Sequence, residues 1–273
     1  MTMSPNPDAL TKTPCLMFLD LPGSGFSFAA DPNTLPSKAA DFGKQLSQAL
    51  NTLAKENPLG QSDTIVIAGE GTFIRSLIDI DDIDALKGVI HLSPWPEMYG
   101  MGLYYGVAGL ELKIYTDASR IAIDSTFASC ANYIRNSKLL EAHQCVDSIF
   151  NFVEDRTKNT NLFDVRQGYN LTEHLPRIQY YFSQSSTVST WKAPTSRLFE
   201  SQAGYIAANT YTDLSKNYNK EISQFTKDFF SVRHLFITGS TDYITYYKGA
   251  LNWIENDLTF VEKDAFKKAK LEV

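Results

Sequence analysis

Short apolar runs alternate along this chain with longer stretches in which apolar residues recur every three or four positions. Short runs rich in β-branched side chains predict buried strands, and the longer spacing predicts amphipathic helices. The predicted strands are Cys15–Asp20, Ile65–Ala68, Leu86–Leu92 and Arg233–Gly239. The predicted helices are Ser37–Glu56, Phe73–Ile78, Ser125–Asp155, Tyr205–Phe230, Tyr247–Leu258 and Glu262–Lys270. This alternation is typical of βαβ units and predicts an α/β fold with a mainly parallel sheet flanked by helices.

The stretches between these elements predict connections. We interpret the acidic run Asp79–Asp84 as a solvated connection, because like charges are best accommodated where water screens them. Ser93–Gly109, rich in Trp, Tyr, Met and Gly, is predicted as a loop with aromatic packing, and Asn159–Ser201 as a polar, interrupted region. The helical middle, at about residues 118–200, is interpreted as a cap inserted between two strands of a single domain that spans residues 1–273.

Composition narrows the classes of partner. The chain has 273 residues, of which 43% are hydrophobic and 21% charged, so it has ample material for a globular core. Its formal net charge is -6, and no basic cluster with interleaved aromatic residues occurs, which argues against nucleic acid as a partner. No apolar run is long enough to cross a bilayer, so we expect no direct membrane span.

The cysteines and the first residues of the chain give information on the cellular compartment of the protein. Three cysteines, Cys15, Cys130 and Cys145, form no metal-binding motif, and at most one disulfide is expected, between Cys130 and Cys145. The favoured interpretation is three reduced, mostly buried thiols. Met1–Pro14 lacks the apolar core of a secretory signal. The chain is therefore expected inside the cell, in the cytosol or an organelle such as the mitochondrion, unless a leader has already been removed.

No cofactor is predicted. The loop Leu21–Ser27 contains two glycines, but their spacing differs from that of a phosphate-binding loop, which argues against a nucleotide site. No metal site is predicted either. The cysteines form no metal motif, and the paired acids of the Asp79–Asp84 run, although they could bind a metal, are interpreted as a solvated connection.

The turn after the Ile65–Ala68 strand carries the most informative chemistry. Gly69-Glu70-Gly71 follows the strand, and a helix follows the turn. A strand, a sharp turn and a helix are the context of the nucleophile elbow G-x-S-x-G, in which a serine occupies the turn. Here Gly71 holds the place of the serine. The pattern predicts the frame of a hydrolase without its nucleophile.

An ordered series of segments then resembles the serine carboxypeptidase family of the α/β-hydrolase fold. Ile67-Ala-Gly-Glu-Gly71 is similar to the family's I-A-G-E-S nucleophile turn except at the serine. Phe18–Ser27 is similar to the family's L-D-Q-P-x-G-x-G-F-S segment, and Leu86–Ile90 to its L-K-G-I-A-I-G-N-G segment. Asn161–Arg166 is similar to N-x-Y-D-x-R, and Gly239–Asp242 to G-D-x-D. The resemblance implies a truncated α/β-hydrolase-like fold, with a helical cap insertion in its middle.

The same resemblance implies roles for three residues. Asp242 occupies the catalytic acid position, Glu70 the place of a glutamate that helps to bind the substrate's C-terminal carboxylate, and Gly71 the nucleophile position. The family's W-L-N-G-G-P-G segment, which supplies the oxyanion hole, is expected before Cys15, and its G-H-M-V-P histidine after the tail. Since neither occurs in the chain, the resemblance implies an inactive homologue, because acyl transfer needs a nucleophile, a base and oxyanion donors.

Other side chains are poor substitutes for the missing groups. Thr72 follows the lost serine by one residue, which aims its hydroxyl elsewhere, and Ser76 lies about one helical turn further on. His91, at the carboxyl end of a predicted strand, lies at the edge where such a site would form. We expect it to be a hydrogen-bonded structural histidine, since no nucleophile accompanies it. The other histidines are His143, His174 and His234.

The favoured hypothesis is a non-catalytic, structural or accessory subunit of a larger assembly. Other protein subunits would then cover the sheet edges. The resemblance implies a missing strand between the Cys15–Asp20 and Ile65–Ala68 strands, which either pair directly or leave a gap that another chain fills. It also implies that the Arg233–Gly239 strand has lost a neighbour. One alternative is a binding module that holds a peptide or small ligand in a remnant cleft formed by Glu70, His91 and Asp242. Another is an active carboxypeptidase completed by a second chain.

Overall fold

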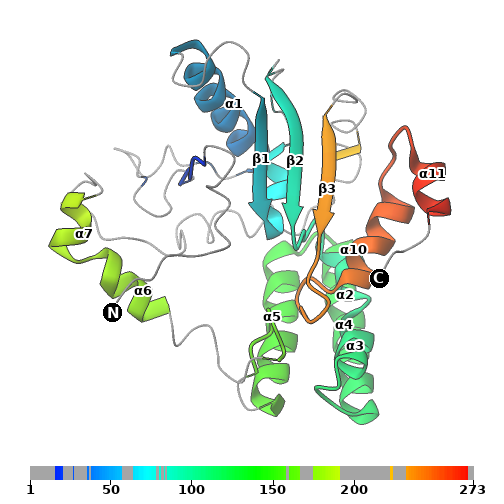
Figure 1. Cartoon of the computed structure of the whole chain (residues 1–273). Coiled ribbons are helices and arrows are strands. Elements are labelled where there is room, and N and C mark those ends of the chain that lie inside the picture. The colour runs from blue at the N-terminus through cyan, green and yellow to red at the C-terminus, as the bar shows by residue number, and fades with distance from the viewer. Residues whose placement is uncertain are drawn as a thin grey trace.

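A three-stranded parallel sheet forms the centre of the molecule in the computed structural model (Figure 1). The structure describes residues 16–20, 27, 36, 38–56, 64–77, 80, 83, 85–157, 160–166, 175–190, 222–223 and 232–269. The strands are β1 (Ile65–Glu70), β2 (Leu86–Leu92) and β3 (Arg233–Ile237), in the order β1-β2-β3. All three run in the same direction, as the alternation of strands and helices predicts.

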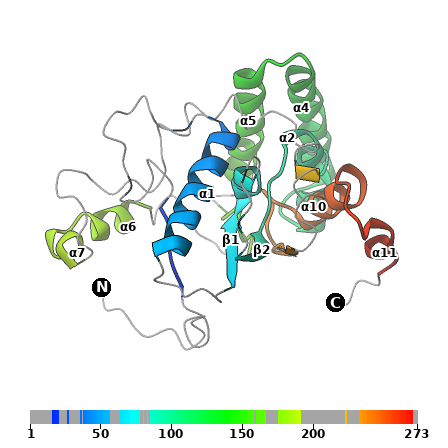
Figure 2. The ribbon, with the colours of Figure 1, turned by 90° about the horizontal axis from the view of Figure 1, so that it is seen from above.

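Helices surround this sheet. They are α1 (Ala39–Glu56), α2 (Met98–Gly102), α3 (Tyr105–Glu111), α4 (Asp117–Arg135), α5 (Leu139–Thr157), α6 (Leu175–Phe182), α7 (Ser185–Thr190), α10 (Tyr247–Asn252) and α11 (Lys263–Lys268). A 3₁₀ helix, η3 (Gly71–Leu77), follows β1 directly, and a π-helical turn, η5 (Trp253–Asp257), extends α10. Seen from above, α1, α4 and α5 lie on the same side of the sheet (Figure 2). No helix of the described part is long and apolar enough to cross a membrane.

The buried apolar residues form three clusters. Leu46 and Leu50 of α1 pack with Leu86 and Val89 of β2, which attaches α1 to one face of the sheet. The largest cluster joins α3, α4 and α5 to the loop after β3, where Tyr243 is fully buried. A smaller cluster surrounds Trp253. Burial of this apolar surface is the main force that holds the helices to the sheet.

The predicted strand Cys15–Asp20 is wrong. Residues 16–20 have no regular secondary structure and are exposed, and the side chain of Phe18 is 88% exposed. An apolar run becomes a strand only where a neighbouring strand accepts its backbone hydrogen bonds, and no described strand pairs with these residues. Within the described part of the chain, β1 and β3 are therefore the two outer strands.

The predicted aromatic loop Ser93–Gly109 contains helices α2 and α3, which is a second correction. The carboxylate of Glu97 caps α2 by accepting hydrogen bonds from the backbone N–H groups of Tyr99, at 2.8 Å, and Gly100. Such a cap satisfies backbone donors that the first turn leaves open. The glycine-rich composition of this segment does not predict a helix from local propensity. In the fold, tertiary packing of its aromatic residues outweighs their low helix propensity.

The middle of the chain also differs from its prediction. The helical stretch Ser125–Asp155 is two helices, α4 and α5, and the polar region Asn159–Ser201 includes α6 and α7. Cys130 of α4 and Cys145 of α5 form a disulfide with their Cα atoms 5.4 Å apart, which corrects the interpretation of three reduced thiols. The assignment of residues 118–200 as a cap insertion stays a prediction.

The remaining elements agree with their predictions. The helices α1, α10 and α11 and the strands β2 and β3 lie within the expected stretches, whereas β1 extends two residues beyond Ala68 into the predicted turn. The predicted helix Tyr205–Phe230 lies outside the described residues except for Ile222, which packs against Trp253, and Ser223. The carboxylates of Asp79–Asp84 also lie outside them. The prediction of an α/β fold with a parallel sheet flanked by helices is confirmed.

Candidate functional site

The carboxyl ends of the three strands meet at one edge of the sheet, in the lower half of Figure 1. The register places Glu70 beside Leu92, and Leu92 beside Ile237. The segments that follow these residues therefore emerge side by side. In open parallel sheets, ligand and catalytic sites lie at this edge, so the candidate site is here.

Gly71 is the turn between β1 and η3. Its φ is +59°, in the left-handed region that glycine adopts without the steric cost of a Cβ. Its carbonyl accepts a hydrogen bond from the backbone N–H of Trp95, at 2.9 Å, which fixes the turn against the segment after β2. A Cβ placed on Gly71 would meet no atom within 4 Å. A sharp turn that suits glycine thus joins β1 to η3, with open space where a side chain at position 71 would lie.

Asp242 is buried in the loop after β3. Its carboxylate accepts hydrogen bonds from the backbone N–H of Thr245, at 2.8 Å, and from the Thr245 hydroxyl, and it also bonds the Ser93 hydroxyl. Burial raises the pKa of this carboxyl, and these hydrogen bonds oppose the rise. The carboxylate consequently stabilises the turn of its own loop and joins it to the segment after β2.

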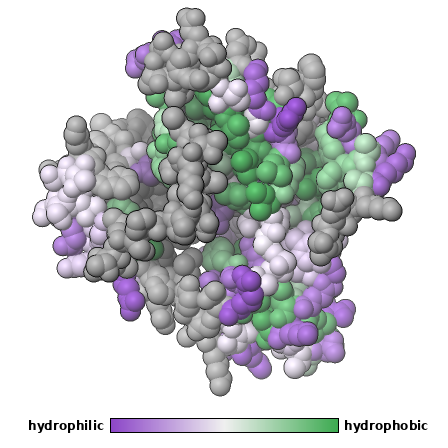
Figure 3. All heavy atoms as spheres, viewed as in Figure 1, coloured by the Kyte–Doolittle hydropathy of each residue, from purple (hydrophilic) through white to green (hydrophobic). Residues whose placement is uncertain are grey.

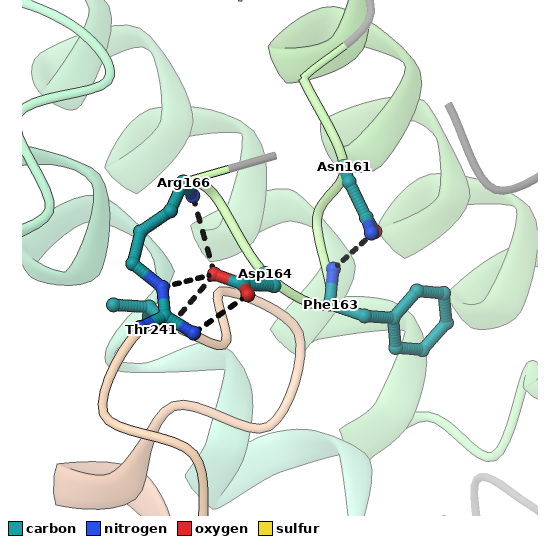
Figure 4. A network of polar contacts seen from close by, with 5 residues as sticks. All are labelled: Asn161, Phe163, Asp164, Arg166 and Thr241. Atoms are coloured by element: carbon teal, nitrogen blue, oxygen red, sulfur yellow. Dashed lines mark hydrogen bonds and ion pairs between the residues drawn. The ribbon is translucent and has the colours of Figure 1, made fainter. Parts of the chain in front are cut away.

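A polar network holds the Asp242 loop in place, and it comes from the motif Asn161–Arg166 (Figure 4). The Asp164 carboxylate accepts hydrogen bonds from Arg166 Nε and Nη2, both at 2.8 Å, and from Thr241 Oγ1 at 2.9 Å. The guanidinium of Arg166 lowers the pKa of Asp164 below its usual range. Backbone bonds add to the network, from Val165 N to Thr241 O at 3.0 Å and from Tyr243 N to Leu162 O at 2.9 Å. This motif positions the loop that carries Asp242.

His91 is a buried member of β2, and its partner is His234 of β3. Nε2 of His91 lies 3.1 Å from Nδ1 of His234, which is hydrogen-bond distance, and the ring of Phe236 stacks on His91. Burial lowers the pKa of His91 from 6.5 to about 3, with a further effect of His234. Burial likewise lowers the pKa of His234 to about 4. The ring of His91 is therefore buried and hydrogen-bonded, as the sequence predicts, and its structural role stays a prediction.

The residues of the predicted remnant cleft take different positions. Glu70 is exposed, whereas His91 pairs with Gly69 in the register and its side chain is 2% exposed. Because successive side chains of a strand alternate, Glu70 and His91 lie on opposite faces of the sheet. Asp242 is buried in the loop beyond β3. That these three residues bind a ligand together stays a prediction.

Two buried polar residues near the elbow were missed by the sequence analysis. Arg75 of η3 is 2% exposed, and its Nε donates to the carbonyl of Pro96 at 2.8 Å. Glu97, the cap of α2, is 4% exposed, and burial raises the pKa of its carboxyl. Both side chains bind the segment after β2, and no local pattern in the sequence reveals such a contact.

The remaining candidates lie in η3, in α5 or outside the described residues. Thr72 lies in the first turn of η3, and the side chain of Ser76 lies outside the described residues, as does His174. The ring of His143 pairs with Asp147 on α5, at 3.0 Å. The described residues bring no three His, Cys, Asp or Glu side chains together as a metal site.

Comparisons with protein-family models and with curated protein sequences found no match. Among solved structures, the chain is similar to the crystal structure of Kex1(delta)p, a prohormone-processing carboxypeptidase from Saccharomyces cerevisiae. The two are 17% identical with a TM-score of 0.66, and the match covers 86% of this chain and 58% of that one. The chain thus spans less than two thirds of that carboxypeptidase's length. At this identity the likeness establishes the fold, and the chain has an α/β-hydrolase-like architecture similar to that of a carboxypeptidase.

Proposed function

We propose that this chain is a non-catalytic serine-carboxypeptidase-like protein that acts as a structural or accessory subunit of a larger assembly. The observation that carries this proposal is Gly71 at the turn after β1, with a φ of +59°. A serine hydrolase requires a hydroxyl at this turn, and glycine has no side chain to supply it. The similarity in fold to a carboxypeptidase is the reason why the residue at position 71 bears on catalytic activity.

The environments of the acid and histidine candidates support the proposal. The Asp242 carboxylate is bonded to Thr245 and Ser93, and the His91 ring is bonded to His234 inside the protein. A general base must lie within hydrogen-bond reach of the group that it deprotonates. Both groups instead stabilise local structure, as expected of side chains retained without catalysis.

The outer strands support the role of a subunit. β1 and β3 each have one edge that pairs with no described strand. Such an edge presents a row of backbone N–H and C=O groups that attracts another strand or must be covered. We expect another polypeptide to cover at least one of these edges in the native assembly.

The proposal is tested by labelling with a fluorophosphonate probe. The protein should show no covalent label above background and no carboxypeptidase or esterase activity, because no activated hydroxyl lies at the elbow. An active serine carboxypeptidase, treated in parallel, serves as the positive control. A label mapped by mass spectrometry to a serine or threonine of this chain, Thr72 included, would refute the proposal.

Gly71→Ser should restore no turnover and should lower the free energy of unfolding by about 1–3 kcal/mol. A lone serine has no base to deprotonate it, and a non-glycine residue at positive φ is strained. Chemical denaturation measures the loss, with Gly71→Ala and Gly71→Asn as controls. Alanine should lose about as much as serine, whereas asparagine, which tolerates the left-handed region, should lose less. Robust hydrolysis by Gly71→Ser would contradict the proposal.

A further inference from the structure

One face of the sheet is exposed and mostly apolar. The register arranges its residues in three rows across β1, β2 and β3, and we call this set the outer sheet face. The rows are Val66, Gly88 and Arg233; Ala68, Ile90 and Leu235; and Glu70, Leu92 and Ile237. The opposite face carries His91 and packs against the core.

Exposure of this face is unusual for its type of sheet. The side chains of Val66, Leu235 and Ile237 are 54%, 52% and 48% exposed. Figure 3 shows hydrophobic residues gathered over the strands on this side, and Figure 2 shows α1, α4 and α5 on the other. Parallel sheets are buried on both faces in nearly all proteins, because their strands are apolar on both sides. Within the described part of the chain, the outer sheet face is therefore a candidate surface for a partner.

The charges on this face identify the partner. Glu70 ends β1 at one corner, and Arg233 begins β3 at the diagonally opposite corner. Both are exposed. Gly88, in the row of Arg233, has no side chain and leaves a hollow beside Val66. A face with opposite charges at opposite corners and an apolar diagonal between them is complementary to itself.

We propose that the outer sheet face binds the same face of a second copy of this chain. A two-fold axis that runs across the charged diagonal places Glu70 of each copy on Arg233 of the other. With strands about 4.8 Å apart and about 3.3 Å per residue, the two sheets then cross at roughly 70°, near the orthogonal class of sheet packing. This contact is isologous, so both charge pairs form at once. It goes beyond the proposed function, because it requires neither activity nor its absence.

The size of the face predicts the strength of the dimer. The nine positions span only about 10 Å across the strands and about 13 Å along them. A standard interface buries about 800 Å² on each partner, which is more than this face alone provides. The dimer should therefore be weak and should form reversibly at micromolar to millimolar concentration.

Sedimentation equilibrium of the full chain tests the proposal. The wild-type protein should show a monomer–dimer equilibrium, and Leu235→Asp should weaken it at least about tenfold, because a charge is buried in an apolar contact. Ile121→Asp is the matched control, since Ile121 is 68% exposed on α4, away from the sheet. It should leave the equilibrium unchanged. A wild-type protein that stays monomeric at millimolar concentration, or equal loss in both variants, would overturn the proposal.

Charge reversal tests the geometry. Glu70→Arg and Arg233→Glu should each weaken the homodimer about fivefold to tenfold, because each places two like-charge pairs in the interface. A mixture of the two variants should dimerise as well as wild type, since all pairs are again of opposite sign. So should the double variant. Circular dichroism confirms that each variant is folded. Failure of the mixture to recover, or a wild-type complex only with a different protein, would exclude the self-association.

Discussion

Acidification from pH 7 to pH 5 is expected to lower the free energy of unfolding through His91 and His234. Their pKa values are lowered from 6.5 to about 3 and about 4, so the folded protein keeps both rings neutral in this range. The unfolded chain takes up protons below pH 6.5, which favours unfolding. Each histidine contributes about 1.4 kcal/mol per pH unit below that value, so the pair should cost about 2–4 kcal/mol at pH 5. Their stabilising contribution is fully present above pH 6.5 and is lost as the pH falls toward 4 and 3.

The loss is measured by urea denaturation at pH 7 and pH 5. His91→Gln with His234→Gln keeps hydrogen-bonding side chains without a titrating ring, and it should reduce the difference between the two pH values by most of the expected amount. His143→Gln is the control and should keep the acid loss. Asp242 and Glu97 have raised pKa values and act in the opposite direction, so the comparison between variant and wild type isolates the histidines. An unchanged pH dependence in the double variant would show that His91 and His234 are not the source of the acid loss.

Loss of the disulfide between Cys130 and Cys145 is expected to destabilise the protein by about 3 kcal/mol. The bond closes a loop of sequence separation 15, and a cross-link of this length removes that much conformational freedom from the unfolded chain. Because a single bond is involved, Cys130→Ala, Cys145→Ala and the double variant should lose similar amounts rather than additive ones. For a chain of this size the melting temperature should fall by about 5–10 °C.

Calorimetry with and without reductant measures this effect, and reduced wild type should resemble the double variant. Thiol titration of the unfolded, unreduced protein is an independent check. Of three cysteines, one should react, namely Cys15. Three reactive thiols would show that the bond is absent in solution.

Several elements of this fold follow from local sequence alone. β1, β2 and β3 are short β-branched or apolar runs, and α1 has an uninterrupted apolar stripe. Each pattern therefore predicts one type of secondary structure. The turn at Gly71 is predictable as well, because a strand followed by Gly-Glu-Gly and then a helical pattern indicates a sharp change of backbone direction at the glycines.

Other features depend on contacts between distant segments. Leu16–Asp20 is as apolar as a strand, yet it remains without regular structure, since a strand also needs a neighbour. The cap at Glu97 forms within glycine-rich sequence, and the Cys130–Cys145 bond follows from the way α4 packs on α5. Local patterns contain no information about these choices.

The candidate site shows most clearly which features the local sequence predicts and which depend on the tertiary structure. The sequence by itself determined that glycine occupies the turn at position 71 and that Asp242 and His91 follow or end strands. Only the tertiary structure decided that His91 lies against His234 and that Glu70 faces the other side of the sheet. The register of β2 with its neighbours sets these positions, and a shift by one residue would exchange the two faces. That register depends on hydrogen bonds between segments separated by more than 100 residues along the chain, as from His91 to Phe236.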